Sequence, residues 1–217
     1  MRHVAQRSDI RDLILDGVDV LLAQYGYKKM TMEDLAQQVG IGKGTIYLHF
    51  TSKEELTLAH IDRITDRLLH ELRVIAESGE PADKRLRKML VLRVLFRFDS
   101  VRHYSQSLND LLSSLRKEFL VRRQEYFQKE MDIFSRVLEE GKKEGVLRFA
   151  DKHSTAQVLV WSTNSLLPYS LTTRELGSRA DIEERVTRIA NLILRGLGSI
   201  SMKKRHRPLK QQKTAFA

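Results

Sequence analysis

Apolar residues recur at steps of three and four along most of the 217-residue chain, and this helical period limits its fold more than any other feature. The first segment carries it clearly, through Ile10, Leu13, Ile14, Val18 and Leu21. No run alternates apolar and polar residues as a half-buried strand does, and only 3 prolines interrupt the pattern. The sequence therefore predicts an all-α protein.

Glycines, prolines and capping residues divide this pattern into helices. We expect Gly26 to end the first helix and Thr31 to cap the second, because glycine and a hydroxyl side chain suit those two positions. Another helix should begin at Lys53 and stop before Pro81. The helices after it are expected near residues 82–98, 105–114, 116–144, 152–170 and 181–197.

Composition excludes several classes of protein. The chain has no cysteine, which rules out a disulfide framework, a Cys-ligated metal site and a thiol nucleophile. Its longest apolar stretches fall well short of the ~18 residues that a membrane span needs. The first residues are charged and lack the apolar core of a secretory signal. We therefore expect a cytoplasmic protein that does not cross a membrane.

A formal charge of +10 favours an acidic partner such as nucleic acid, but the charge is unevenly placed. Residues 1–60 hold 7 basic and 8 acidic residues, whereas residues 203–217 hold 6 basic residues and no acidic ones. We expect the basic tail, residues 201–217, to be disordered. Bulk charge therefore does not identify the part of the chain that would bind nucleic acid.

Residues 31–56 carry the pattern of a helix-turn-helix, whose second helix enters the DNA major groove. Gly40 suits the sharp turn, and a helix from Lys43 to His49 would bury Ile46. The glycine-rich run does not fit a nucleotide-binding loop, because it lacks the four-residue gap and follows a helix. A DNA-binding segment is the better interpretation.

Hydrogen-bond donors on this segment suit phosphates and base edges. Lys43 is the candidate for guanine O6 or N7. The side chains expected to reach phosphates are Thr45, Tyr47, His49 and Lys53. Residues 35–53 contain no carboxylate, so we expect a positive local field over this face.

The run from Thr31 to Leu56 closely resembles the signature of tetracycline-repressor-like (TetR-type) transcription regulators, above all in Gly-Thr-Ile-Tyr-Leu-His-Phe followed by Ser-Lys-Glu-Glu-Leu. The resemblance implies an amino-terminal DNA-binding domain, placed at residues 1–52, and a larger helical effector-binding and dimerisation domain, placed at residues 53–200. It implies phosphate contacts from Thr31, Thr45, Tyr47 and Lys53, with Lys43, Gly44 and Leu48 facing the bases. Gly42 departs from the usual Ser or Thr and offers no hydroxyl.

The rest of the chain favours a small-molecule pocket over a catalytic site. Aromatic and polar residues that suit an oriented apolar cavity are Phe96, Tyr104, Tyr126, Trp161, Asn164 and Tyr169, although each singly also suits plain core packing. Arg97 and His103 would neutralise an acidic ligand. The scattered histidines form no metal motif, and no catalytic triad can be assembled. We therefore expect no enzyme activity, no metal and no cofactor.

Together these features predict a ligand-responsive repressor that binds a pseudo-palindromic operator in double-stranded DNA as a homodimer and is released by a small molecule. By resemblance, the last two long helices would form the dimer interface. Three alternatives stay open: an activator, an all-α small-molecule-binding protein without specific DNA binding, and a basic protein that binds anionic membranes through residues 203–217.

Overall fold

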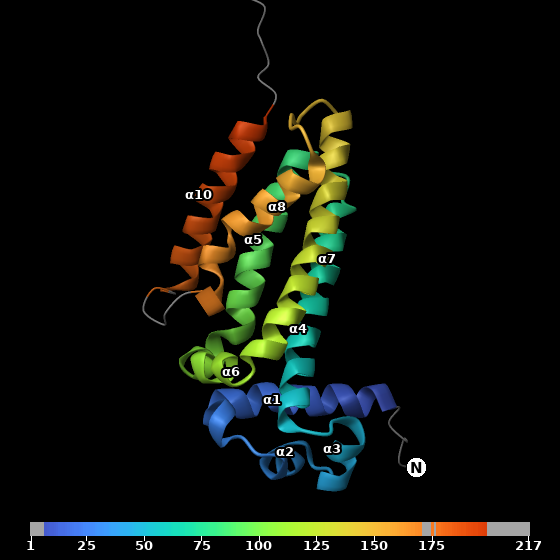
Figure 1. Ribbon diagram of the computed structural model, residues 1–217, viewed down its shortest axis with the longest axis vertical. Coiled ribbons are helices and arrows are strands. Elements are labelled where there is room, and N and C mark those ends of the chain that lie inside the picture. The colour runs from blue at the N-terminus through green and yellow to red at the C-terminus, as the bar shows by residue number, and fades with distance from the viewer. Residues whose placement is uncertain (1–6, 171–174, 176, 199–217) are drawn as a thin grey trace, which may run out of the picture.

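The computed structural model describes residues 7–170, 175 and 177–198, and Figure 1 shows two stacked helical parts. The lower part, called the head, contains α1 (Arg7–Lys29), α2 (Met32–Val39) and α3 (Lys43–His49). The upper part, called the body, contains α4 (Lys53–Ala76), α5 (Ala82–Val101), α6 (Leu108–Ser114), α7 (Arg116–Lys143), α8 (Lys152–Ser162) and α10 (Arg179–Leu197). Within the described ranges the only strand-like pairing is an isolated bridge between Leu147 and Gly198, so the all-α prediction is confirmed. The predicted tail, residues 201–217, lies outside the described residues.

Close packing of α1 on α2 builds the head. Gly17 permits this approach, since a Cβ atom there would lie 2.5 Å from Val39 Cγ1. The Thr31 hydroxyl caps α2 by accepting from the Asp34 N–H at 3.1 Å, and the Asp34 carboxylate accepts from the Thr31 N–H at 3.0 Å. Gly40, with a φ of 69°, ends α2 in the left-handed conformation. The predicted cap and turn are confirmed.

The head joins the body along α1, which lies across the foot of the long helices (Figure 1). Gly26 leaves helical geometry at a φ of 71°, and a Cβ atom there would lie 2.9 Å from Ser107 Cβ. Two residues further, Lys28 Nζ pairs with Asp110 at 2.7 Å. The apolar cluster of the head also continues into the body, through Leu58, Ala59, Tyr104, Leu108, Leu111 and Leu115. The head therefore shares its core with α4 and α6.

A second apolar cluster fills the body, where α5 packs against α4 and α10, and α7 packs against α4 and α8. A buried charge network crosses this core. Arg93 donates to Glu130 at 2.7 Å and to the Val160 carbonyl at 2.9 Å, while Arg97 donates to the other Glu130 oxygen. Burial alone would raise the pKa of Glu130, but the two guanidinium groups outweigh it and hold that pKa below its usual value. The network links α5, α7 and α8.

The helix predicted over residues 152–170 is wrong in its second half, because α8 ends at Ser162. Pro168 has no N–H to donate and disfavours helical geometry in the residue before it, and Leu167 accordingly has an extended φ of −78° and ψ of 145°. Two short 3-10 turns take the place of the missing helix, Asn164–Leu166 and Pro168–Ser170. Likewise, α5 runs to Val101, past the break expected at residues 99–100.

Candidate DNA interface and ligand cavity

The outer edge of α3 is presented to solvent because its inner face is buried. Ile46 is fully buried in the head cluster, as predicted, and so is Phe50, the residue that follows α3. Between them, Tyr47 is 46% exposed and Leu48 is 76% exposed. A helix that buries residues four apart directs those between them away from the core. The helix α3 lies at the free end of the head (Figure 1). Its exposed edge carries Tyr47 and Leu48, two of the predicted DNA-contacting residues.

The first turn of α3 carries little side-chain bulk. Gly42 is the N-cap residue and makes no side-chain capping hydrogen bond, as its missing hydroxyl requires. Gly44 is exposed, and a Cβ atom there would meet no described atom within 4 Å. Thr45 follows, half-buried. The backbone of this turn can therefore approach another surface closely.

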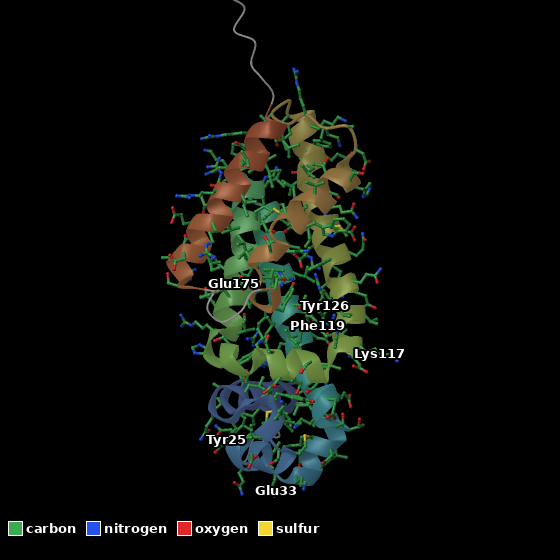
Figure 2. All side chains as sticks on the ribbon, turned by 60° about the vertical axis from the view of Figure 1, so that its left-hand side comes forward. Tyr25, Glu33, Lys117, Phe119, Tyr126 and Glu175 are labelled. Atoms are coloured by element: carbon green, nitrogen blue, oxygen red, sulfur yellow. The ribbon has the colours of Figure 1, made fainter. Side chains whose placement is uncertain are left out.

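Lys43, the predicted base-contacting residue, has a partner within the head. Its Nζ lies 2.9 Å from Glu33 Oε2, and the hydrogen bond to that carboxylate raises the Lys43 pKa. Figure 2 shows Glu33 at the tip of the head. Both side chains are largely exposed, so the pair is a weak one. Glu33 nevertheless reduces the positive potential expected from residues 35–53 alone.

Other predicted DNA contacts have roles inside the fold. Thr31 caps α2 with its hydroxyl, and His49 is half-buried at the end of α3. Lys53 Nζ donates to the Tyr27 carbonyl at 3.1 Å and to the Met30 carbonyl at 3.2 Å, and it lies 4.6 Å from the Tyr27 ring centroid. Lys53 therefore holds the turn after α1 against α4, and its contact with phosphate stays a prediction.

A cavity of about 60 Å³ lies in the part of the body next to the head, between α4, α6 and α7. Figure 2 shows two of its residues, Phe119 and Tyr126, just above the head. The described residues that line it are Ile61, Ile64, Thr65, Arg97, Val101, Tyr104, Leu108, Leu111, Leu112, Phe119, Arg123, Tyr126, Phe127, Pro168 and Tyr169. The wall is mostly apolar, with a few polar groups, which is the usual character of a small-molecule site.

The structure brings together three of the six predicted ligand-binding residues. Those lining the cavity are Tyr104, Tyr126 and Tyr169. Phe96 instead lines a surface groove beside α10. Trp161 and Asn164 line another groove next to α7, where Trp161 is 56% exposed and Asn164 accepts a hydrogen bond from Arg93. Phe96 on α5, and Trp161 and Asn164 at and just after the end of α8, therefore face surfaces other than the cavity.

Among the cavity residues that the sequence-based reasoning missed are Phe119 and Arg123. They stand with Tyr126 at positions i, i+4 and i+7 of α7, so they share one helix face. A charged residue on such an apolar face is the signal that points to Arg123. Arg97, proposed from the sequence to neutralise an acidic ligand, does line the cavity, whereas His103 lines a different groove.

Neither a membrane segment nor a metal cluster occurs in the described part of the chain. No described helix is both long and apolar enough to span a bilayer. The described residues also contain no group of three or more His, Asp or Glu side chains that could hold a metal ion.

The exposed α3 edge on a three-helix head defines a DNA-binding regulator of the helix-turn-helix class. Residues 14–59 match the family described as bacterial regulatory proteins, tetR family. Over 156 residues the chain is 32% identical to the uncharacterized HTH-type transcriptional regulator YhgD of Bacillus subtilis, a match that covers 70% of this chain and 79% of YhgD. The chain belongs to the tetR family of bacterial regulatory proteins, and it is a transcription regulator rather than an enzyme.

Solved structures share this fold. A transcriptional regulator from Cytophaga hutchinsonii superposes with a TM-score of 0.71 at 24% identity, covering 87% of this chain and 98% of its own. SmeT, the repressor of the Stenotrophomonas maltophilia multidrug efflux pump SmeDEF, was solved in complex with triclosan. That complex superposes with a TM-score of 0.65 at 20% identity, covering 88% of this chain and 92% of SmeT.

Proposed function

We propose that the chain is a ligand-responsive repressor that binds a pseudo-palindromic DNA operator as a homodimer. The observation that carries the proposal is that α3 has one buried and one exposed face at the free end of the head. Ile46 and the following Phe50 are buried, whereas Tyr47 and Leu48 are exposed. A short exposed helix behind a tight turn has the shape that enters a major groove. An activator would use the same DNA contacts and differ in where its operator lies relative to the promoter.

In the proposed complex, different residues of the head contact the bases and the phosphates. Lys43, Gly44 and Leu48 face the bases, and Lys43 exchanges the Glu33 carboxylate for a base edge. The phosphate contacts come from Thr31, Thr45 and Tyr47, with His49 nearby. Lys53 can add a contact only by giving up its two carbonyl partners, so we assign it mainly to holding the turn after α1.

The position of the cavity supports a ligand response. Residues of α6 and of the 3-10 segment before it, Arg102–Ser107, line the cavity, and the same short stretch contacts α1 through Ser107 and Asp110. A ligand that moves α6 would therefore also move the head. The complex of SmeT with triclosan supports the idea that this fold accepts a small molecule. By linkage, a ligand that weakens DNA binding must itself bind the DNA-bound protein less tightly by the same factor.

Exposed apolar side chains support a dimer through α8 and α10. Val158 and Trp161 on α8 are each 56% exposed, and Leu192 on α10 is 75% exposed. Exposed apolar side chains that gather into one patch are typical of a protein interface, and the proposal places these three in such a patch. A dimer formed there would present two heads to two half-sites about one helical turn, or a small multiple of it, apart.

The test begins with selection of bound fragments from the genomic DNA of the source organism, which supplies the operator. Gel-shift affinities are then measured for Lys43→Ala and Tyr47→Phe. We expect Lys43→Ala to weaken the operator complex by about tenfold and to relax base preference at one position. Tyr47→Phe should weaken binding to every DNA sequence by a similar factor. Lys117→Ala, on the exposed first turn of α7, is the control for losing one positive charge.

Operator affinity that does not change in either head variant would overturn the assignment of α3. Selection that yields no DNA, with a ligand still bound, would favour an all-α binding protein without specific DNA binding. A reporter gene placed behind the selected promoter separates repressor from activator, since deletion of the regulator raises expression in the first case and lowers it in the second.

A further inference from the structure

We propose that the cavity takes a small hydrophobic carboxylate, whose carboxylate group pairs with Arg97 and Arg123 and whose apolar body fills the rest of the space. This inference rests on the proposed ligand response and names the chemical class of the ligand. It follows from the charges around the cavity, from the position of Arg123 and from the nature of the remaining wall.

The charges around the cavity are unbalanced. Among the described lining residues there are two arginines, Arg97 and Arg123, and no Asp or Glu. The nearest buried carboxylate, Glu130, is already engaged at both oxygens, one by Arg93 and the other by Arg97. The side chains of Arg93, Arg97 and Glu130 are fully or nearly buried, and together they carry two positive charges and one negative charge. Because an uncompensated buried charge is costly, the group that the site lacks is an anion.

Arg123 is held in place by aromatic rings, and its hydrogen-bond donors are not used on any carboxylate of the described residues. Its guanidinium carbon lies 5.0 Å from the Phe127 ring centroid and 5.3 Å from the Tyr169 ring centroid, and the side chain is half-buried. Within the described ranges it forms no ion pair of 4.0 Å or less. A guanidinium that stacks on aromatic rings keeps its N–H edge available, and that edge matches the two oxygens of a carboxylate.

The rest of the wall requires an apolar and compact ligand body. Ile64, Val101, Leu111 and Phe119 contribute side chains that cannot form hydrogen bonds. The Tyr126 hydroxyl is already bonded to the Asp62 carboxylate, so it is not an open polar position. The cavity volume is about 60 Å³, so we propose a small apolar body such as a phenyl or short alkyl group. Sugars and nucleotides are too polar and too large.

The test uses matched sets of ligands that differ only in charge. The full-length protein is titrated by calorimetry with phenylacetate, phenylacetamide and 2-phenylethylamine, and with the straight-chain carboxylates from butanoate to octanoate and their amides. We expect at least one carboxylate to bind about tenfold or more tightly than its own amide, because charge-assisted hydrogen bonds are the stronger ones. The amine should bind more weakly than both. The inference is wrong if no carboxylate binds at about 1 mM, or if the amides bind equally well.

Variants locate the binding. Arg123→Gln should bring the affinity for the carboxylate to within about threefold of that for the amide, while leaving amide binding unchanged. Arg123 has no ion pair in the described part of the fold, so this change should not unfold the protein. Arg136→Gln, which removes the same charge from an exposed position of α7, should keep the full preference. A preference that survives Arg123→Gln would overturn the assignment of this residue.

Failure of this inference can be distinguished from failure of the proposed function by measuring operator release with the same ligands. If the amide or the amine binds and releases the operator, the ligand response stands and the carboxylate preference is wrong. If the carboxylate binds through Arg123 but DNA affinity stays the same, the ligand class stands and the proposed response is wrong.

Discussion

At the scale of single residues, the ion pair between Lys43 and Glu33 bears directly on the proposed DNA contact of Lys43. The pair joins α2 to α3 on the face that would meet DNA, and DNA must compete with Glu33 for the lysine. We predict that Glu33→Gln strengthens operator binding by about threefold to fivefold, because Lys43 is released and a negative charge is removed from the face. A gel-shift titration at fixed salt measures the change.

Glu118→Gln is the matched control for this prediction. It removes one negative charge from an exposed position of α7, outside the head. An equal gain of affinity in both variants would mean that net charge alone is responsible and that the Glu33 pair does not restrain Lys43. A gain confined to Glu33→Gln would support the local effect.

His60 makes the stability of the protein depend on pH. The side chain is 2% exposed, and neither ring nitrogen makes a hydrogen bond to a described residue. The Asp19 carboxylate lies 3.6 Å from Nε2, but burial dominates and, together with the charge of Arg63, lowers the His60 pKa to about 4. Between about pH 6.5 and about pH 4 the unfolded chain thus binds a proton here that the folded protein does not, and the free energy of unfolding falls as the pH falls.

We predict that His60→Leu removes this share of the pH dependence. The wild-type protein should lose up to about 3 kcal/mol more than the variant between about pH 7 and about pH 4. Urea unfolding followed by circular dichroism at several pH values measures the difference. His70→Leu, at an exposed position of the same helix, should behave like the wild type. Parallel pH profiles for the wild type and His60→Leu would contradict the prediction.

At the scale of helices, the contact between α1 and the segment before α6 depends on one glycine. Gly26 combines a φ of 71° with a ψ of 168°, a conformation that is almost restricted to glycine, and it lies against Ser107. We predict that Gly26→Ala destabilises the protein by about 2 kcal/mol or more, through backbone strain and through the clash with Ser107 Cβ. Thermal unfolding of the purified variant measures the loss.

Two further variants separate the two causes. Gly40→Ala introduces a left-handed alanine with no atom near its Cβ, so it should lose only about 1–2 kcal/mol. Adding Ser107→Gly to Gly26→Ala removes the clashing side chain and should restore part of the stability. If the second change restores nothing, the close contact between α1 and the segment before α6 does not contribute.

Sequence patterns were most successful for helices whose signals are local. The cap at Thr31, the turn at Gly40 and the buried Ile46 of α3 all depend on residues a few positions apart, and each was predicted. The end of α8 was not predicted, because the apolar stripe continues beyond Ser162, where the α-helix gives way to a 3-10 turn before Pro168 is reached. Periodicity reports which face a helix would bury, and it does not report where the helix ends.

At the scale of the whole molecule, the proposed dimer depends on exposed apolar side chains of α8 and α10. We predict that Leu192→Glu shifts the protein from dimer to monomer, because it replaces an exposed leucine of the proposed interface with a charge, whose burial between two protomers is costly. Operator affinity should fall with it, since one head alone contacts only one half-site. Sedimentation velocity measures the first effect and a gel shift the second.

Val74→Glu is the control for the dimer prediction. Val74 is 53% exposed on α4, outside the proposed interface, and the same substitution there should leave the oligomeric state unchanged. A Leu192→Glu protein that remains dimeric, and still binds the operator as the wild type does, would contradict the proposed interface.

The sequence by itself determined the helical class, the helix-turn-helix and the tetR family, because these depend on period, caps and a contiguous signature between Thr31 and Leu56. Only the tertiary structure decided which side chains meet across helices. It placed Glu33 beside Lys43, gave Lys53 two carbonyl partners, and brought Arg97 and Arg123 to one cavity. Contacts of this kind depend on how helices cross and on where they end. Neither property can be predicted from local patterns when the residues involved are far apart in the chain.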